Sequence, residues 1–256
     1  MIFAVLVASM AVSQARADAD VSFQRCVELL TQGAYYSSSG TRYTHNDTVK
    51  WPRLPSEAAL RVCSVDPAKR DTAQRCLYEL AAGVSTQSDG DHNNPAVVER
   101  WPHHDPVQAS RLCAANADSE ASWKRAGNCL NELMHGILVS SSGGRSVATD
   151  QEKYPRIREV AAVEVCRRPQ ESYQDSTRCF LEMARGITFS SQGSRIRAPN
   201  NPPPQTVPDM GAAHLCGRNP SEEGRACLRN RSLRPSRRRW RAGLAGITRV
   251  SRFNSA

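Results

Sequence analysis

The sequence predicts a mainly α-helical protein made of four tandem repeats of about 50 residues, each a helical hairpin stapled by one disulfide. Three observations predict this fold. Two cysteines recur four times with the same 37-residue separation, apolar side chains after the first cysteine follow a helical period, and a polar insert separates the two halves of each repeat. A fixed period of this kind is typical of repeat architectures. If the inserts form β-hairpins, the fold class becomes α+β.

The cysteine pairs define the repeats. The pairs are Cys26 and Cys63, Cys76 and Cys113, Cys129 and Cys166, and Cys179 and Cys216. The corresponding repeats, called units 1 to 4 below, are expected to span residues 22–63, 72–113, 125–166 and 175–216. The separation between neighbouring units varies from 13 to 16 residues, so the segment between the two cysteines of a pair is the folding unit.

Residues 1–17 are predicted to be a signal peptide. An apolar run over Ile2–Val12 leads into the small-residue cleavage pattern Ala15-Arg16-Ala17, although a positively charged start is missing. The alternative, a transmembrane helix, needs roughly 20 apolar residues, and this run is shorter. Disulfides also form in oxidising compartments. We therefore expect an exported protein, extracellular or periplasmic, without a transmembrane segment.

Each first cysteine is expected to open a helix of about ten residues. Apolar residues follow it by one, four and eight positions, which places them on one helical face. In units 1 to 4 the first of these positions holds Val27, Leu77, Leu130 and Phe180. Seven positions after the cysteine stand Gly33, Gly83, Gly136 and Gly186. Glycine there predicts a left-handed residue that ends the helix.

The polar inserts share a serine, a glycine and a cationic or imidazole side chain, 12, 14 and 16 positions after the first cysteine. These residues are Ser38, Gly40 and Arg42, Ser88, Gly90 and His92, Ser141, Gly143 and Arg145, and Ser191, Gly193 and Arg195. One interpretation is local turn chemistry. The other is a candidate binding face, a row of equivalent polar loops that holds an extended protein or polymer.

An aromatic residue and a proline follow the insert in three units. They are Trp51-Pro52, Trp101-Pro102 and Tyr154-Pro155, whereas unit 4 has the proline run 202–204. Two interpretations stay open for these rings. They are exposed platforms for sugars or peptides, or they pack onto the helix that follows them.

The second helix of each unit is predicted to end on the second cysteine. Four positions before that cysteine stand Ala59, Ala109, Ala162 and Ala212, small residues that let a neighbouring helix approach closely. Asp105-Pro106 is typical of a helix start in unit 2, and Asp209 is expected to cap the helix of unit 4.

Antiparallel packing of the two helices favours disulfides within each unit and leaves Cys227 as a free thiol. Each bridge would stabilise a unit by roughly 4 kcal/mol in the chain-entropy model. The rival scheme pairs cysteines across the linkers and leaves Cys26 free. Close-spaced cysteine pairs of the zinc-knuckle type are missing from the sequence.

Catalytic and metal-binding patterns are weak. The six histidines form no repeated column, and Gly-x-Ser-x-Gly does not occur. The Ser-x-Gly of the insert occurs four times, whereas a catalytic serine is normally supplied once. We therefore expect no metal, no cofactor and no enzymatic activity. The alternative is a secreted enzyme or enzyme inhibitor that acts through one insert loop.

The C-terminal segment, residues 217–256, combines a partial fifth repeat at Cys227 with an Arg-rich tail. Of the formal net charge of +9, ten arginines lie at or after Arg225 with no acidic residue among them, so residues 1–224 carry a net charge of −1. The tail is either an arm that binds an anionic partner, such as nucleic acid or a membrane surface, or an aberrant end of the coding sequence. The main expectation for the whole chain is an exported cysteine-repeat protein with a structural or binding role.

Overall fold

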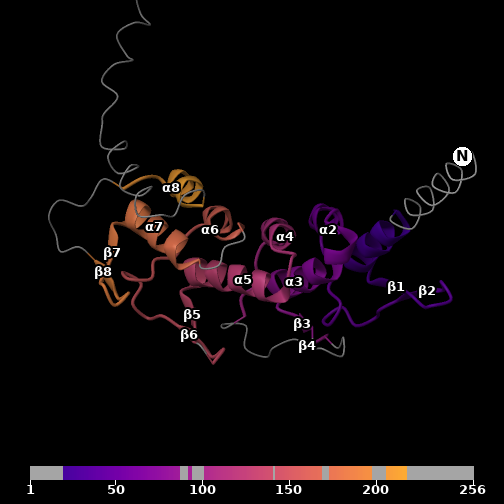
Figure 1. Ribbon diagram of the computed structural model, residues 1–256. Helices are drawn as coiled ribbons and strands as arrows, with labels where there is room; N and C mark the ends of the chain where they lie inside the picture. Colours follow the sequence, from indigo (N-terminus) through magenta and orange to yellow (C-terminus); the bar gives the residue numbers. More distant parts are fainter. Residues whose placement is uncertain are drawn as a thin grey trace, which may run out of the picture.

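The computed structural model describes residues 20–86, 92–93, 101–140, 142–168, 173–197 and 206–217. These residues form a row of four units, each a helix, a β-hairpin and a second helix in that order. Figure 1 shows the second helices (α2, α4, α6 and α8) along one side of the row and the hairpins along the opposite side, with the first helices between them. The predicted mainly α-helical fold with four stapled repeats is confirmed: the inserts do form β-hairpins, but their strands are only two or three residues long and do not change the fold class to α+β.

The elements recur in the same order in each unit, with helix lengths that differ. The first helices are the helix described over residues 20–32, α3 (Arg70–Ala82), α5 (Glu120–His135) and α7 (Gln174–Arg185). The second helices are α2 (Ser56–Cys63), α4 (Pro106–Ala115), α6 (Glu159–Cys166) and α8 (Asp209–Cys216). A short 3₁₀ helix, η1 (Pro67–Lys69), precedes α3.

The inserts are two-stranded antiparallel hairpins. Their strands are β1 (Ala34–Tyr36) with β2 (Arg42–Thr44), β3 (Ser85–Thr86) with β4 (His92–Asn93), β5 (Ile137–Val139) with β6 (Arg145–Val147), and β7 (Ile187–Phe189) with β8 (Arg195–Arg197). The register is the same in the three longer hairpins, for example Ile137 opposite Val147 and Val139 opposite Arg145.

All four disulfides join cysteines within a unit. They are Cys26–Cys63, Cys76–Cys113, Cys129–Cys166 and Cys179–Cys216, with Cα–Cα distances of 5.6 to 5.8 Å. The favoured pairing is therefore confirmed, and the rival pairing across the linkers is wrong. Cys227 and its predicted free thiol lie outside the described residues, as do the predicted signal peptide and the Arg-rich tail.

The prediction that each first cysteine opens its helix is wrong. The cysteine lies inside the helix. α3 begins six residues before Cys76, and α5 begins nine residues before Cys129. The extra turns form because they carry their own buried side chains, among them Ala73 in α3 and Trp123 in α5.

The glycine that ends each first helix is left-handed, as predicted. Its φ lies between 63° and 67° in all four units. The next loop also passes close to it, because a Cβ at Gly83 would lie 2.8 Å from the His103 ring nitrogen Nε2. The left-handed backbone conformation is what requires glycine here, because the His103 side chain can shift.

The second helices pack side by side in the order α2, α4, α6, α8. The alanine four positions before the second cysteine is fully buried in every unit, which agrees with close helix approach. Asp105 caps α4 as predicted, since its carboxylate accepts the Gln108 N–H at 2.9 Å. The expected Asp209 cap is wrong. Asp209 is the first residue of α8 and instead accepts two hydrogen bonds from Arg185, at 2.5 and 2.8 Å.

Candidate functional site

The hairpin turns are held by a serine one position earlier than the predicted one. Ser190 Oγ accepts the backbone N–H of Ser194 at 3.0 Å, and the Gly193 N–H donates to the Ser190 carbonyl at 2.9 Å. The equivalent serines Ser37 and Ser140 make the same side-chain bond. Gly40, Gly143 and Gly193 of the predicted face supply the left-handed residue of the turn, at φ 81° to 83°.

Of the predicted serines, Ser38 and Ser191 lie at turn tips and are exposed. Ser88, Gly90 and Ser141 lie outside the described residues, and for His92 the structure describes only the backbone, within β4. No observation therefore brings these serines together into one site.

Arg145 does not point away from the array but fastens unit 3 to unit 2. Its guanidinium lies 3.5 Å from the centroid of the Trp101 ring and 3.7 Å from the Glu79 carboxylate. Both side chains of the ion pair are nearly buried, Arg145 at 12 % and Glu79 at 10 % exposure. Burial raises the pKa of the Glu79 carboxyl above its ordinary value, with Arg145 opposing the shift.

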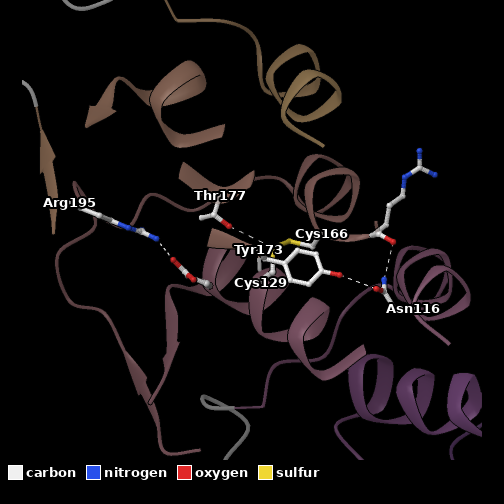
Figure 2. The surroundings of a disulfide bond; sticks show 8 residues. Asn116, Cys129, Cys166, Tyr173, Thr177 and Arg195 are labelled. Atoms are coloured by element: carbon white, nitrogen blue, oxygen red, sulfur yellow. Dashed lines mark hydrogen bonds and ion pairs between the residues drawn. A yellow bond between two sulfur atoms is a disulfide. The ribbon is translucent and has the colours of Figure 1, made fainter. Parts of the chain in front are cut away.

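Arg195 repeats this arrangement between units 4 and 3. It pairs with Glu132, donates to the Lys153 carbonyl at 3.1 Å and lies 4.2 Å from the Tyr154 ring centroid. Figure 2 shows Arg195 aimed at its carboxylate partner. Burial likewise raises the pKa of Glu132. We call each set of arginine, glutamate and aromatic ring a junction clamp.

Arg42, the third described arginine of the predicted face, stays within its own unit. It donates to Glu28 at 3.1 Å and to Gln32 at 2.6 Å. The sequence signal for the clamps, missed above, is a glutamate three positions after the cysteine of one unit combined with the insert arginine of the next.

The aromatic residues before the second helices pack at the junctions. Trp101 and Tyr154 each have a ring face covered by a clamp arginine. Trp51 is stacked on His45, with ring centroids 3.9 Å apart, and meets Tyr78 of unit 2 edge-on. These contacts favour packing over a sugar platform.

A groove opens at each of the three junctions, on the hairpin side. The groove between units 1 and 2 measures about 580 Å³, that between units 2 and 3 about 290 Å³, and that between units 3 and 4 about 530 Å³. Each lining includes a residue just before a first cysteine and strand residues of a hairpin, but the side of the junction differs: the residues named next belong to unit 1 in the first groove, to units 2 and 3 in the second, and to unit 4 in the third. These residues include Arg25 and Tyr36 in the first groove, Arg75 and Val139 in the second, and Arg178 and Phe189 in the third.

A buried polar cluster lies at the central junction. The His104 side chain of unit 2 is fully buried, and its Nε2 lies 2.8 Å from Asn131 Oδ1 of unit 3. Its Nδ1 lies 3.6 Å from the Glu159 carboxylate, which also accepts the Asp105 N–H at 2.9 Å. His135 stands beside it, with ring centroids 5.4 Å apart. Burial lowers the pKa of His135 to about 4, and the neighbouring His104 adds to the shift.

A second polar network surrounds the disulfide of unit 3 (Figure 2). Asn116, fully buried after α4, accepts the Tyr173 hydroxyl at 2.9 Å and donates to the Arg167 carbonyl at 2.9 Å. Tyr173 precedes α7, so this network ties the segments after units 2 and 3 to the start of unit 4.

Within the described ranges, no group of three or more histidine, cysteine or acidic side chains could hold a metal ion. None of the helices in the described part is long and apolar enough to cross a membrane. Comparisons with protein-family models, with curated proteins and with solved structures find no match to this chain.

Proposed function

We propose that this chain is an exported binding protein whose hairpin side receives one extended partner across several units. The observation that carries the proposal is the recurrence of a groove at all three junctions, lined at equivalent positions of the repeat. Repeat arrays commonly use such a row of equivalent sites for an extended ligand. The clamps support it, since they hold successive grooves in a fixed relation.

Export is part of this proposal. Four disulfides indicate an oxidising compartment. The apolar run and cleavage pattern within residues 1–17 support a cleaved signal peptide, and hence an extracellular or periplasmic location. Within such a compartment, stapled units keep the binding side in shape without a large core.

The test is a footprint. Peptides are selected from a displayed library on the full secreted chain, and amide hydrogen exchange is measured with and without the selected peptide. We expect protection in at least two of the hairpins 34–44, 137–147 and 187–197, and none in the row of second helices. Protection of a single hairpin would instead indicate an inhibitor or enzyme loop.

The alternative that the Arg-rich tail carries the binding function is tested in the same experiment. Truncation after Gly224 removes the ten C-terminal arginines. The proposal expects the hairpin footprint to persist in the truncated chain. If binding disappears with the tail, the function belongs to the Arg-rich segment and the proposed hairpin-side function is wrong.

A further inference from the structure

The first and third grooves each contain an arginine stacked on a hairpin aromatic ring. Arg25 lies 4.7 Å from the Tyr36 ring centroid, and Arg178 lies 5.4 Å from that of Phe189. The two arginines occupy the same repeat position, directly before the first cysteine, and the two rings stand ten positions after it. Stacking orients a guanidinium through its face and leaves its N–H edge open to a planar acceptor.

These two guanidinium groups form no ion pair with a carboxylate in the described part of the chain. No described carboxylate lies within 4.0 Å of Arg25 or Arg178. The nearby Glu28 accepts hydrogen bonds from the Tyr36 hydroxyl and from Arg42. The equivalent arginine of unit 2, Arg75, differs, because it pairs with Asp71 at 3.0 Å.

The charged residues that line the grooves also separate the first and third grooves from the central one. Among the described lining residues, the first groove has no acidic side chain, and the third has only Glu132, which pairs with Arg195. Arg125 adds an exposed cation to the third groove. In the central groove, the cations Arg145 and Lys124 are matched by the acids Glu79 and Glu120.

Resting on the proposed function, we propose that the first and third grooves take the carboxylate side chains of an acidic, extended polypeptide. Arginine forks bind carboxylates through two parallel hydrogen bonds, which gives orientation as well as charge complementarity. A polysaccharide fits less well, because cations or an imidazole cover the junction rings on which a sugar would stack. Strand residues of β1 line the first groove, and those of β5 and β7 line the third, and an extended peptide can pair with the backbone groups of such strands.

The experiment uses a fluorescein-labelled peptide of alternating glutamate and serine, its glutamine counterpart, and the full secreted chain. Anisotropy titrations compare wild type with Arg25→Gln, Arg178→Gln and the double variant. Arg61→Gln is the matched control, since this exposed arginine lies on α2, on the opposite side, beside Glu57. All variants keep the Arg-rich tail, so every titration contains the same contribution from it.

We expect each groove variant to weaken glutamate-peptide binding by roughly fivefold to tenfold, with Arg61→Gln unchanged. The affinity should fall with added salt. The proposal is overturned if the double variant binds as wild type does, if the glutamine peptide binds equally well, or if polygalacturonate or polyphosphate binds more tightly through the same arginines.

Hydrogen exchange separates this proposal from the proposed function. A hairpin-side footprint from the glutamine peptide alone keeps the proposed function and removes this inference, whereas no hairpin-side footprint from any selected peptide removes the function itself.

Discussion

The junction between units 1 and 2 can be compared with the two junctions that follow it. The later junctions carry a clamp, built from Arg145 with Glu79 and from Arg195 with Glu132. At the first junction the corresponding positions hold Leu29 and His92, and a stack of rings takes over, with Trp51 between His45 and Tyr78.

The comparison teaches that one backbone repeat supports two kinds of junction. The arginine and the glutamate change together, although they belong to different units, so each junction is a matched pair of surfaces. A packed set of rings depends mainly on burial of ring surface and little on salt, whereas a nearly buried ion pair depends on both partners. We therefore expect the first junction and the later ones to respond differently to the perturbations below.

The largest effect is expected from removing a disulfide. The double variants Cys26→Ser with Cys63→Ser, and Cys129→Ser with Cys166→Ser, should each lose roughly 4 kcal/mol of local stability. In unit 3 the loss should spread, because clamps and the Asn116 network attach that unit to both neighbours. In unit 1 it should stay local. Amide hydrogen exchange, resolved by unit, measures this.

Cys227→Ser is the control for the disulfide variants, since its thiol is predicted to be free. It should leave urea unfolding unchanged. If loss of the unit 1 disulfide unfolds all four units together, the first junction couples the units as strongly as the clamps do, and the distinction between the junctions fails.

The next effect is expected from breaking one clamp. Arg145→Met leaves the Glu79 carboxylate nearly buried without its cation, which costs about 3 kcal/mol for a buried pair. Glu79→Gln should cost less, and the double variant should recover part of the loss in a double-mutant cycle. The exposed pair Arg75 and Asp71 is the control, worth less than about 1 kcal/mol. Additive losses at Arg145 and Glu79 would contradict the clamp.

A smaller effect is expected from acid at the central junction. The folded pKa of His135 is about 4 against an ordinary value of 6.5, so the folded protein binds fewer protons than the unfolded chain between those values. Stability is therefore present above pH 6.5 and is lost as the pH falls toward 4. The groups facing this ring are His104, Arg156 and Glu159. Because the ring is only partly buried and solvent screens its charge, the expected loss in the free energy of unfolding is roughly 1 to 2 kcal/mol.

The measurement is urea unfolding at pH 7 and pH 4.5 for wild type and His135→Gln, the residue that unit 1 has at this position. The raised pKa values of Glu79 and Glu132 act in the opposite sense, because their contribution is lost as the pH rises. The difference between the two proteins isolates His135. The variant should lose less stability in acid than wild type. Equal acid losses for wild type and His135→Gln would refute this assignment.

The periodic part of the structure could be predicted from the sequence. The four cysteine pairs, the left-handed glycines and the buried alanines follow from spacing within one unit. The clamps were missed because they join residues of different units, and a column-by-column comparison treats each unit alone. The insert arginines were assigned to a binding face for that reason, although Arg145 and Arg195 are engaged at the junctions. The length of the first helices was missed because their extra turns vary in sequence.

The turn serine is the remaining difference, and it gives the smallest expected effect. The predicted column passes through Ser191, which is exposed, whereas Ser190 accepts the Ser194 N–H. Ser190→Ala should therefore cost about 0.5 to 1 kcal/mol, and Ser191→Ala less than about 0.5 kcal/mol. Urea unfolding of this matched pair measures the difference. A larger loss from Ser191→Ala would mean that the turn is held by the residue that the sequence pattern favours, and that the side-chain bond of Ser190 contributes little. If neither variant changes stability but Ser191→Ala weakens binding of the selected peptide, the turn tips belong to the binding face after all.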